Sequence, residues 1–202
     1  LLLLARLDAG RDLSRDEVDL VGILLDTVSD ARAASSAYWQ MFEEHMKDGE
    51  FADVHILGTW VHGPGMIHSN KEVTSPDDMQ GMRIRGATRQ VNALLEQLGA
   101  TPVGMPVPAV SEALSKGVID GTTIPWEVTT ALKVPELVDN HTEFEGAHLY
   151  NVTFVLAMNK DRYESLPDDL KAVIDANSGH DFSVFAGGTQ SDADGPSRQI
   201  AV

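Results

Sequence analysis

The residues with the clearest chemical potential lie in "GMRIRGATRQ", residues 81–90. A strand that ends at Gly86 would place Arg83 and Arg85 on one face and its apolar residues on the other. The helix expected after this strand brings free N–H groups and a positive dipole end close to Arg85. A guanidinium there can bind a carboxylate through two parallel hydrogen bonds. The pattern therefore predicts an anion site, and the alternative is that both arginines pair with surface Asp or Glu.

A second candidate group lies in "VIDGTTIPWE", residues 118–127. The Asp-Gly pair predicts a turn, and the proline is typical of the first turn of a helix. Trp126 at this helix start could form one wall of a pocket, or it could be a core tryptophan near the surface. Glu127 could act as an acid or base, but a carboxylate in a first helical turn also suits the helix dipole.

Histidines form a third group, around "TWVHGPGMIH" at residues 59–68. A neutral His62 beside a pocket could donate a hydrogen bond to a ligand oxygen, although a lone histidine in a loop is more often incidental. His55, His62 and His68 lack the close helical spacing of a zinc pair, and the chain has no cysteine. We therefore expect no metal site and no cofactor, and the sequence has no phosphate-loop, dinucleotide or nucleophile-elbow motif.

The composition limits the partners. The chain has 202 residues, with 15 Lys+Arg against 31 Asp+Glu and a formal net charge of -16. Such an acidic surface argues against nucleic acid or an anionic membrane as a partner, but a local site for a small anion remains possible. The opening "LLLLAR" is too short for the apolar region of a signal peptide, and no stretch reaches the roughly 18 apolar residues of a membrane helix.

The elements that must position these residues alternate between strands and helices. This alternation predicts βαβ units and a parallel or mixed sheet, which is an α/β fold. The polar tail from residue 180 to 202 is expected to fray. Helices are predicted at residues 14–28, 29–49 with a cap at Ser29, 87–100, 108–121, 125–134 and 166–179, and extended segments at 52–70, 82–86, 101–107 and 148–160.

Three segments together resemble the solute-binding subunits of tripartite ATP-independent periplasmic (TRAP) transporters of the DctP-like family. They are "SPDDMQGMRIRG", then "LGATPVGMPVPAVSEALSKGVIDGTTIPWE", then "FVLAMNKDRYESLPDDLKAVIDANSG". Their order and spacing match the family over about residues 31 to 180. The middle segment is the most specific of the three, because it joins a short strand, a helix-turn and a proline in a fixed order.

The resemblance implies a two-lobed periplasmic-binding-protein-like fold, with mixed sheets flanked by helices. The first lobe is expected at residues 1–84 and to be incomplete, the second at 85–158, and helices that pack back across the lobes at 159–202. The family implies a periplasmic protein, with its signal peptide removed, that captures a small organic acid and delivers it to the membrane permease subunits. It implies no enzymatic activity.

The resemblance also assigns residues. Arg85 matches the family arginine that forms a salt bridge with the ligand carboxylate, whereas Arg83 is expected to meet solvent or a surface carboxylate. Gly65 stands near the place of a second family arginine, Val107 replaces an aromatic residue, and Ile124 replaces an asparagine of sugar-binding members. Fewer polar groups predict a less hydroxylated acid, such as an aromatic or aliphatic carboxylate or a 2-oxo acid.

Three functions are compared on this basis. In the first, a binding protein, Arg85 anchors the carboxylate, Trp126 packs on the ligand, and His62 and Thr123 add hydrogen bonds. In the second, an enzyme acting on a small acid, His62 or Glu127 would be the base, but the sequence shows no nucleophile or cofactor motif. In the third, a ligand-sensing domain passes its closure to a partner receptor.

Overall fold

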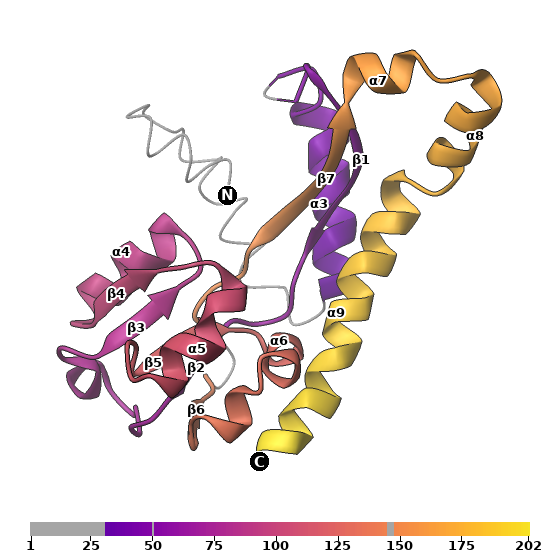
Figure 1. Cartoon of the computed structure of the whole chain (residues 1–202). Helices are drawn as coiled ribbons and strands as arrows, with labels where there is room; N and C mark the ends of the chain where they lie inside the picture. The colour runs from indigo at the N-terminus through magenta and orange to yellow at the C-terminus, as the bar shows by residue number, and fades with distance from the viewer. Residues whose placement is uncertain (1–30, 50, 145–147) are drawn as a thin grey trace. The chain divides into compact units, whose positions relative to one another are not determined.

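A computed structural model gives the structure of most of the chain (Figure 1). It describes residues 31–49, 51–144 and 148–202. The helix predicted over residues 14–28 and the cap predicted at Ser29 lie outside the described residues.

The described chain divides into two compact units. Unit 1 contains the described residues up to Gly63 together with Asn151–Asp192, and unit 2 contains those of Pro64–Tyr150 together with Ala193–Val202. These divisions differ from the lobe boundaries predicted after residues 84 and 158. The reason is strand pairing between distant segments, which a pattern read along the chain does not reveal.

Unit 1 is built on a two-stranded antiparallel sheet of β1 (Val54–Val61) and β7 (Thr153–Asn159). The β-branched and aromatic residues of β1 favour this extended form. Helix α3 (Ala31–His45) packs against β1 (Figure 1). The core of the unit consists of Ala34, Tyr38, Phe42, Met46, Ile56 and Val61.

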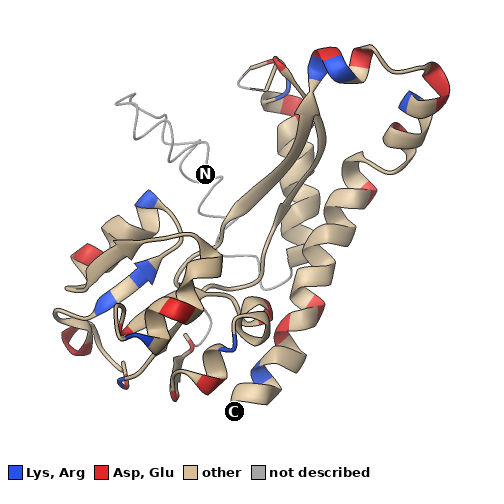
Figure 2. Ribbon diagram, viewed as in Figure 1, with Lys and Arg blue, Asp and Glu red and all other residues tan. Residues whose placement is uncertain are grey.

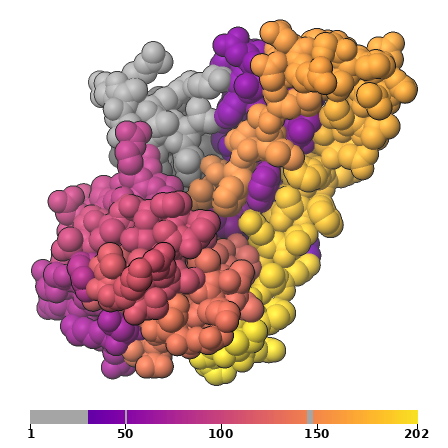
Figure 3. Space-filling model, in the orientation of Figure 1, coloured from indigo at the N-terminus to yellow at the C-terminus, as the bar shows by residue number. Residues whose placement is uncertain are grey.

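Two helices and the first part of a third, up to Asp192, complete unit 1. β7 leads into α7 (Lys160–Glu164) and α8 (Asp168–Ala176), whose atoms gather in orange at one end of this unit in Figure 3. Helix α9 (Gly179–Ala201) follows, so the expectation that the tail frays is wrong. Its small residues permit close packing: Ser183 Oγ accepts a hydrogen bond of 3.0 Å from the Thr59 N–H of β1.

Unit 2 is built on a five-stranded mixed sheet. Its order is β4-β3-β5-β2-β6, in which β3 is parallel to β4 and β5, while β2 is antiparallel to β5 and β6. The strands are β2 (Met66–Ser69), β3 (Arg83–Gly86), β4 (Thr101–Gly104), β5 (Gly121–Ile124) and β6 (Asn140–Thr142). β5 and β6 were not predicted, because all four residues of β5 are buried without alternation and β6 has only three residues.

Short helices connect these strands. Local capping explains two of their starts: Ser75 and Asp78 form a capping box, and Thr88 Oγ1 accepts a hydrogen bond of 3.2 Å from the Val91 N–H. The helices are α4 (Arg89–Gln97), α5 (Val110–Ser115) and α6 (Trp126–Ala131), with 3-10 turns η1 (Pro76–Met79), η2 (Val107–Ala109) and η3 (Val134–Glu136).

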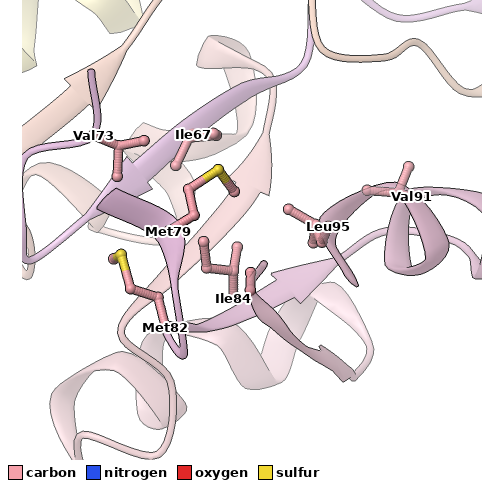
Figure 4. Close-up of a cluster of buried hydrophobic side chains, with 8 residues drawn as sticks. Ile67, Val73, Met79, Met82, Ile84, Val91 and Leu95 are labelled. Atoms are coloured by element: carbon pink, nitrogen blue, oxygen red, sulfur yellow. The ribbon is translucent and has the colours of Figure 1, made fainter. Parts of the chain in front are cut away.

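Two apolar cores hold unit 2 together. One joins α4 to the sheet, where Leu95 and Ile84 are fully buried (Figure 4). Because Ile84 points into this core, the arginines on either side of it in β3 point to the opposite face. The other core lies around α5 and contains Val110, Ala113, Leu114, Ile119, Ile124, Val134 and Val138.

Gly187→Ala is expected to destabilise unit 1, although alanine favours a helix over glycine. A Cβ at Gly187 would overlap Ser35 Oγ and lie 2.7 Å from the backbone oxygen of Ala31 in α3. We expect a loss of roughly 1–3 kcal/mol in the free energy of unfolding, measured in urea. Gly195→Ala in the same helix is the control, because a Cβ there meets nothing within 4 Å. It should stabilise the protein by roughly 0.5–1 kcal/mol, and equal effects of the two variants would contradict the close packing.

Candidate functional site

Arg85 is a buried cation at the end of β3, with 4% of its surface exposed. Its Nε donates a hydrogen bond of 3.2 Å to the Met105 oxygen, and its Nη1 donates one of 3.2 Å to the Thr123 oxygen. Thr123 Oγ1 in turn donates to the backbone oxygen of Arg85 at 3.1 Å. Burial lowers the pKa of the Arg85 guanidinium, and the nearby Tyr150 phenol opposes this shift. Thr123 therefore positions Arg85, and its own hydroxyl is fully buried.

Arg83 behaves differently, although it lies only two residues earlier. Its Nη2 is 2.6 Å from Asp120 Oδ1 and its Nε is 2.9 Å from Asp120 Oδ2. The side chain of Arg83 is 44% exposed. This confirms the prediction that Arg83 meets a surface carboxylate. In Figure 2 the blue segments of β3 contrast with the tan ribbons of the other strands in this sheet, which carry no charged residues in the described chain.

Tyr150 is a neighbour of Arg85 that the sequence did not single out. Its hydroxyl donates a hydrogen bond of 2.9 Å to the Thr123 oxygen, which also accepts from Arg85. Burial raises the pKa of Tyr150 to about 12, against the opposing effects of the Thr123 hydrogen bond and the Arg85 charge. The residue fell inside a predicted long strand at residues 148–160, but the strand begins only at Thr153. Periodicity alone gave no signal for its role.

Gly65 also lies beside Tyr150, and it contacts that residue through its backbone. Its N–H donates a hydrogen bond of 2.9 Å to the Tyr150 oxygen, and the two residues form an antiparallel bridge. A Cβ at Gly65 would lie 2.5 Å from Cδ1 and 2.6 Å from Cζ of Tyr150. The glycine therefore leaves room for the tyrosine ring.

Trp126 is held on several sides by residues of unit 2. Its ring lies 4.7 Å from the ring of His68 in a T-shaped arrangement and 5.1 Å from that of His141. Its Nε1 donates a hydrogen bond of 2.9 Å to Glu143, which also accepts two from Arg198. With only 4% of its surface exposed, Trp126 fits the core alternative better than the open wall of a pocket.

Glu127 forms a carboxyl pair with Asp194 of α9. The Glu127 N–H donates a hydrogen bond of 2.9 Å to Asp194 Oδ1, and burial together with the Asp194 charge raises the pKa of Glu127 to about 8. Burial raises the pKa of Asp194 as well. Glu127 therefore carries a proton at neutral pH, so it could donate a hydrogen bond but would not act as an ionised base.

His62 belongs to unit 1, and both of its ring nitrogens have backbone partners. Nδ1 bonds the Gly63 oxygen, and Nε2 accepts a hydrogen bond of 3.1 Å from the Val152 N–H. Burial lowers the pKa of His62 to about 4, so the ring is neutral with its single proton directed at Gly63. This geometry favours a structural role.

Val107, at the start of η2, is 36% exposed.

His68 is a buried polar residue that sequence reasoning considered only as a metal ligand. Its Nδ1 lies 2.8 Å from His141 Nδ1, and its Nε2 lies 3.1 Å from the Ile124 oxygen. Burial lowers the pKa of His68 to about 4. Among the described residues, no three His, Cys, Asp or Glu side chains are grouped to hold a metal ion. Nor does this part of the chain contain a helix that is both long and apolar enough to cross a membrane.

Several of the predicted residues meet at one edge of the unit 2 sheet. β3 and β5 are parallel, so Arg85 and Thr123 lie at their carboxyl ends, and β2 is antiparallel, so Gly65 precedes its amino end at the same edge. We call this the carboxyl edge, defined by Arg85, Thr123, Gly65 and Tyr150. Ligands of open α/β sheets bind outside such an edge.

A family model matches most of the chain. The family model for bacterial extracellular solute-binding proteins, family 7 (DctP), matches residues 27–179. The chain belongs to this family. The family assignment confirms the recognition drawn from the three sequence segments, and it describes extracellular solute-binding proteins rather than enzymes.

Solved structures of TRAP solute-binding proteins are similar to this DctP-family chain. One from Rhodoferax ferrireducens T118, in complex with copurified benzoate, is 44% identical with a TM-score of 0.82, over 89% of this chain and 57% of that chain. One from a marine metagenome, described as specific for aromatic acid ligands and bound to metahydroxyphenylacetate, is 41% identical with a TM-score of 0.79, over 86% and 55%. These matches confirm the predicted mixed α/β fold.

A curated relative is more distant. The C4-dicarboxylate-binding periplasmic protein DctP of Rhodobacter capsulatus is 29% identical over 116 residues, which are 57% of this chain and 34% of the relative. The chain thus spans about a third of this relative and somewhat over half of the two solved structures.

Glu127→Gln is expected to flatten the fall in the free energy of unfolding between about pH 5 and pH 8. The folded protein favours the neutral carboxyl, so its stabilising contribution is complete below the ordinary pKa of 4.5 and is lost as the pH rises through about 8. Glutamine stays uncharged throughout this range. Urea unfolding of wild type and variant at several pH values measures the slope.

Asp194→Asn serves as the companion variant. It removes the neighbouring charge but leaves Glu127 buried, so it should flatten the same slope only in part. A wild-type slope that both variants leave unchanged would contradict a raised Glu127 pKa.

Proposed function

We propose that this chain is part of a TRAP-type solute-binding protein that captures a small aromatic acid, with Arg85 binding the carboxylate. One observation carries the proposal: Arg85 is buried, its hydrogen bonds go to two carbonyl oxygens, and it forms no salt bridge within the described residues. A buried charge is costly unless it is paired with an opposite charge. A ligand carboxylate would supply that charge.

Similar solved structures and the site itself support this ligand class. Neighbours that are 44%, 41% and 29% identical were solved with benzoate, metahydroxyphenylacetate and mandelate, all aromatic acids. At the carboxyl edge the Thr123 side chain is buried and Gly65 contributes no side chain, while the neighbouring Ile124 belongs to the core around α5. Few polar groups would then face the body of the ligand, which suits an aromatic ring better than a hydroxylated sugar acid.

The remaining predicted residues take different parts in this proposal. Thr123 acts through Arg85, and Trp126 supports the edge from within unit 2. Glu127, in its protonated form, and Val107 stay proposed ligand neighbours. For the whole protein we propose the family role, which is delivery of the acid from the periplasm to the TRAP permease subunits.

Arg85→Gln is expected to weaken the binding of benzoate by at least about 100-fold, because it removes the charge and the paired donors at once. Isothermal titration calorimetry with benzoate at fixed pH and salt measures the dissociation constant. Arg85→Lys keeps the charge but not the paired geometry, so it should fall between wild type and Arg85→Gln.

Arg83→Gln is the matched control on the same strand. Arg83 already pairs with Asp120, so its loss should change the dissociation constant for benzoate by less than about threefold. Near-native binding by Arg85→Gln, or equal losses in both variants, would refute the assignment of Arg85 as the carboxylate ligand.

A further inference from the structure

We propose that Tyr150 is a specificity-determining residue: its ring fills the space that Gly65 leaves open beside Arg85 and selects for an aromatic monocarboxylate. This inference rests on the proposed function and adds to it the residue that distinguishes one acid from another. It concerns only residues of unit 2.

The first observation is the position of the ring. Gly65 and Tyr150 face each other in an antiparallel bridge, with the Gly65 N–H 2.9 Å from the Tyr150 oxygen and the Leu149 N–H 3.3 Å from the Gly65 oxygen. Directly opposed residues send their side chains to the same face of a sheet. The Tyr150 ring therefore lies where a side chain at position 65 would lie, as the 2.5 and 2.6 Å approaches to a Cβ there show.

The second observation is that this ring reaches Arg85. The Tyr150 hydroxyl and Arg85 Nη1 donate to the same oxygen of Thr123, at 2.9 and 3.2 Å. The two groups are close enough for each to influence the pKa of the other. A ligand whose carboxylate binds Arg85 thus has the phenol ring beside it.

The chemistry of this pairing is selective. The ring offers an apolar surface for edge or face contact with an aromatic acid. It adds no cation, and its hydroxyl proton is already directed at Thr123, so a second carboxylate on the ligand would lose water without gaining a partner. An aromatic monocarboxylate is therefore favoured over a dicarboxylate.

The pair offers a double-mutant test. A Cβ at Gly65 meets the far end of the Tyr150 side chain, so Gly65→Ala displaces the ring and should have the same effect as Tyr150→Ala. Calorimetry with benzoate and with succinate gives the ratio of their dissociation constants in each variant. We expect Tyr150→Ala and Gly65→Ala each to weaken benzoate binding at least tenfold and to reduce the preference over succinate.

Two further variants separate specificity from folding. Tyr150→Phe keeps the ring, so it should retain most of the preference for benzoate. Adding Gly65→Ala to Tyr150→Ala should have little further effect, because the ring that the methyl group displaces is then absent. If Tyr150→Ala does not fold, as judged by thermal unfolding, Tyr150→Leu replaces it, since leucine keeps apolar volume without a ring.

The outcomes distinguish this inference from the proposed function. Failure of the wild-type protein to bind benzoate, or binding that does not depend on Arg85, would refute the proposed function. Arg85-dependent binding with a benzoate-to-succinate ratio unchanged in Tyr150→Ala or Tyr150→Leu would overturn only the role of Tyr150. Additive effects of the Gly65 and Tyr150 replacements would overturn it as well.

Discussion

The buried guanidinium of Arg85 is the constraint on which the carboxyl edge depends. The N–H donors of a buried cation need hydrogen-bond acceptors. Here the acceptors are the backbone oxygens of Met105, just after β4, and of Thr123, within β5. Those oxygens are available only because β4 and β5 flank β3 in parallel register. Thr123 closes the arrangement by bonding both the side chain and the backbone of Arg85. The two carbonyl oxygens accept from Nε and Nη1 but do not neutralise the guanidinium, so its charge is available to an anion.

Two arginines that lie two residues apart on β3 have different surroundings. Arg83 and Arg85 share a face of β3, yet Arg83 meets Asp120 at the surface while Arg85 is enclosed by the ends of its neighbours. Strand periodicity predicted the shared face, and the family resemblance separated the two roles. Helix starts were also predictable, because Ser75 and Thr88 carry their capping signals locally. Strand periodicity and helix capping depend on residues that are close in the chain, so they can be predicted from the sequence.

Other features depend on contacts between distant segments and could not be predicted in the same way. Composition predicted a fraying tail where α9 lies, because glycines and serines lower helix propensity, whereas the family resemblance implied helices at residues 159–202. The small residues of α9 let it approach α3 closely. The short strand β5 showed no alternation because its residues are buried throughout. Tyr150 is positioned by its bridge to Gly65, which lies 85 positions earlier in the chain. The family resemblance drew attention to Gly65, but it did not indicate which residue occupies the space beside it.

The charge balance of the edge explains how an acidic chain can hold an anion. The net charge of -16 would repel a carboxylate if ionised side chains surrounded Arg85. Glu127, which influences the pKa of Tyr150 and so lies near this edge, has its own pKa raised to about 8 by burial and by Asp194. It is therefore mostly neutral at pH 7, and it does not cancel the charge of Arg85. Burial disfavours both charges, and it lowers the pKa of Arg85 while it raises that of Glu127. The guanidinium stays protonated because its ordinary pKa lies far above 7. The site is therefore electropositive.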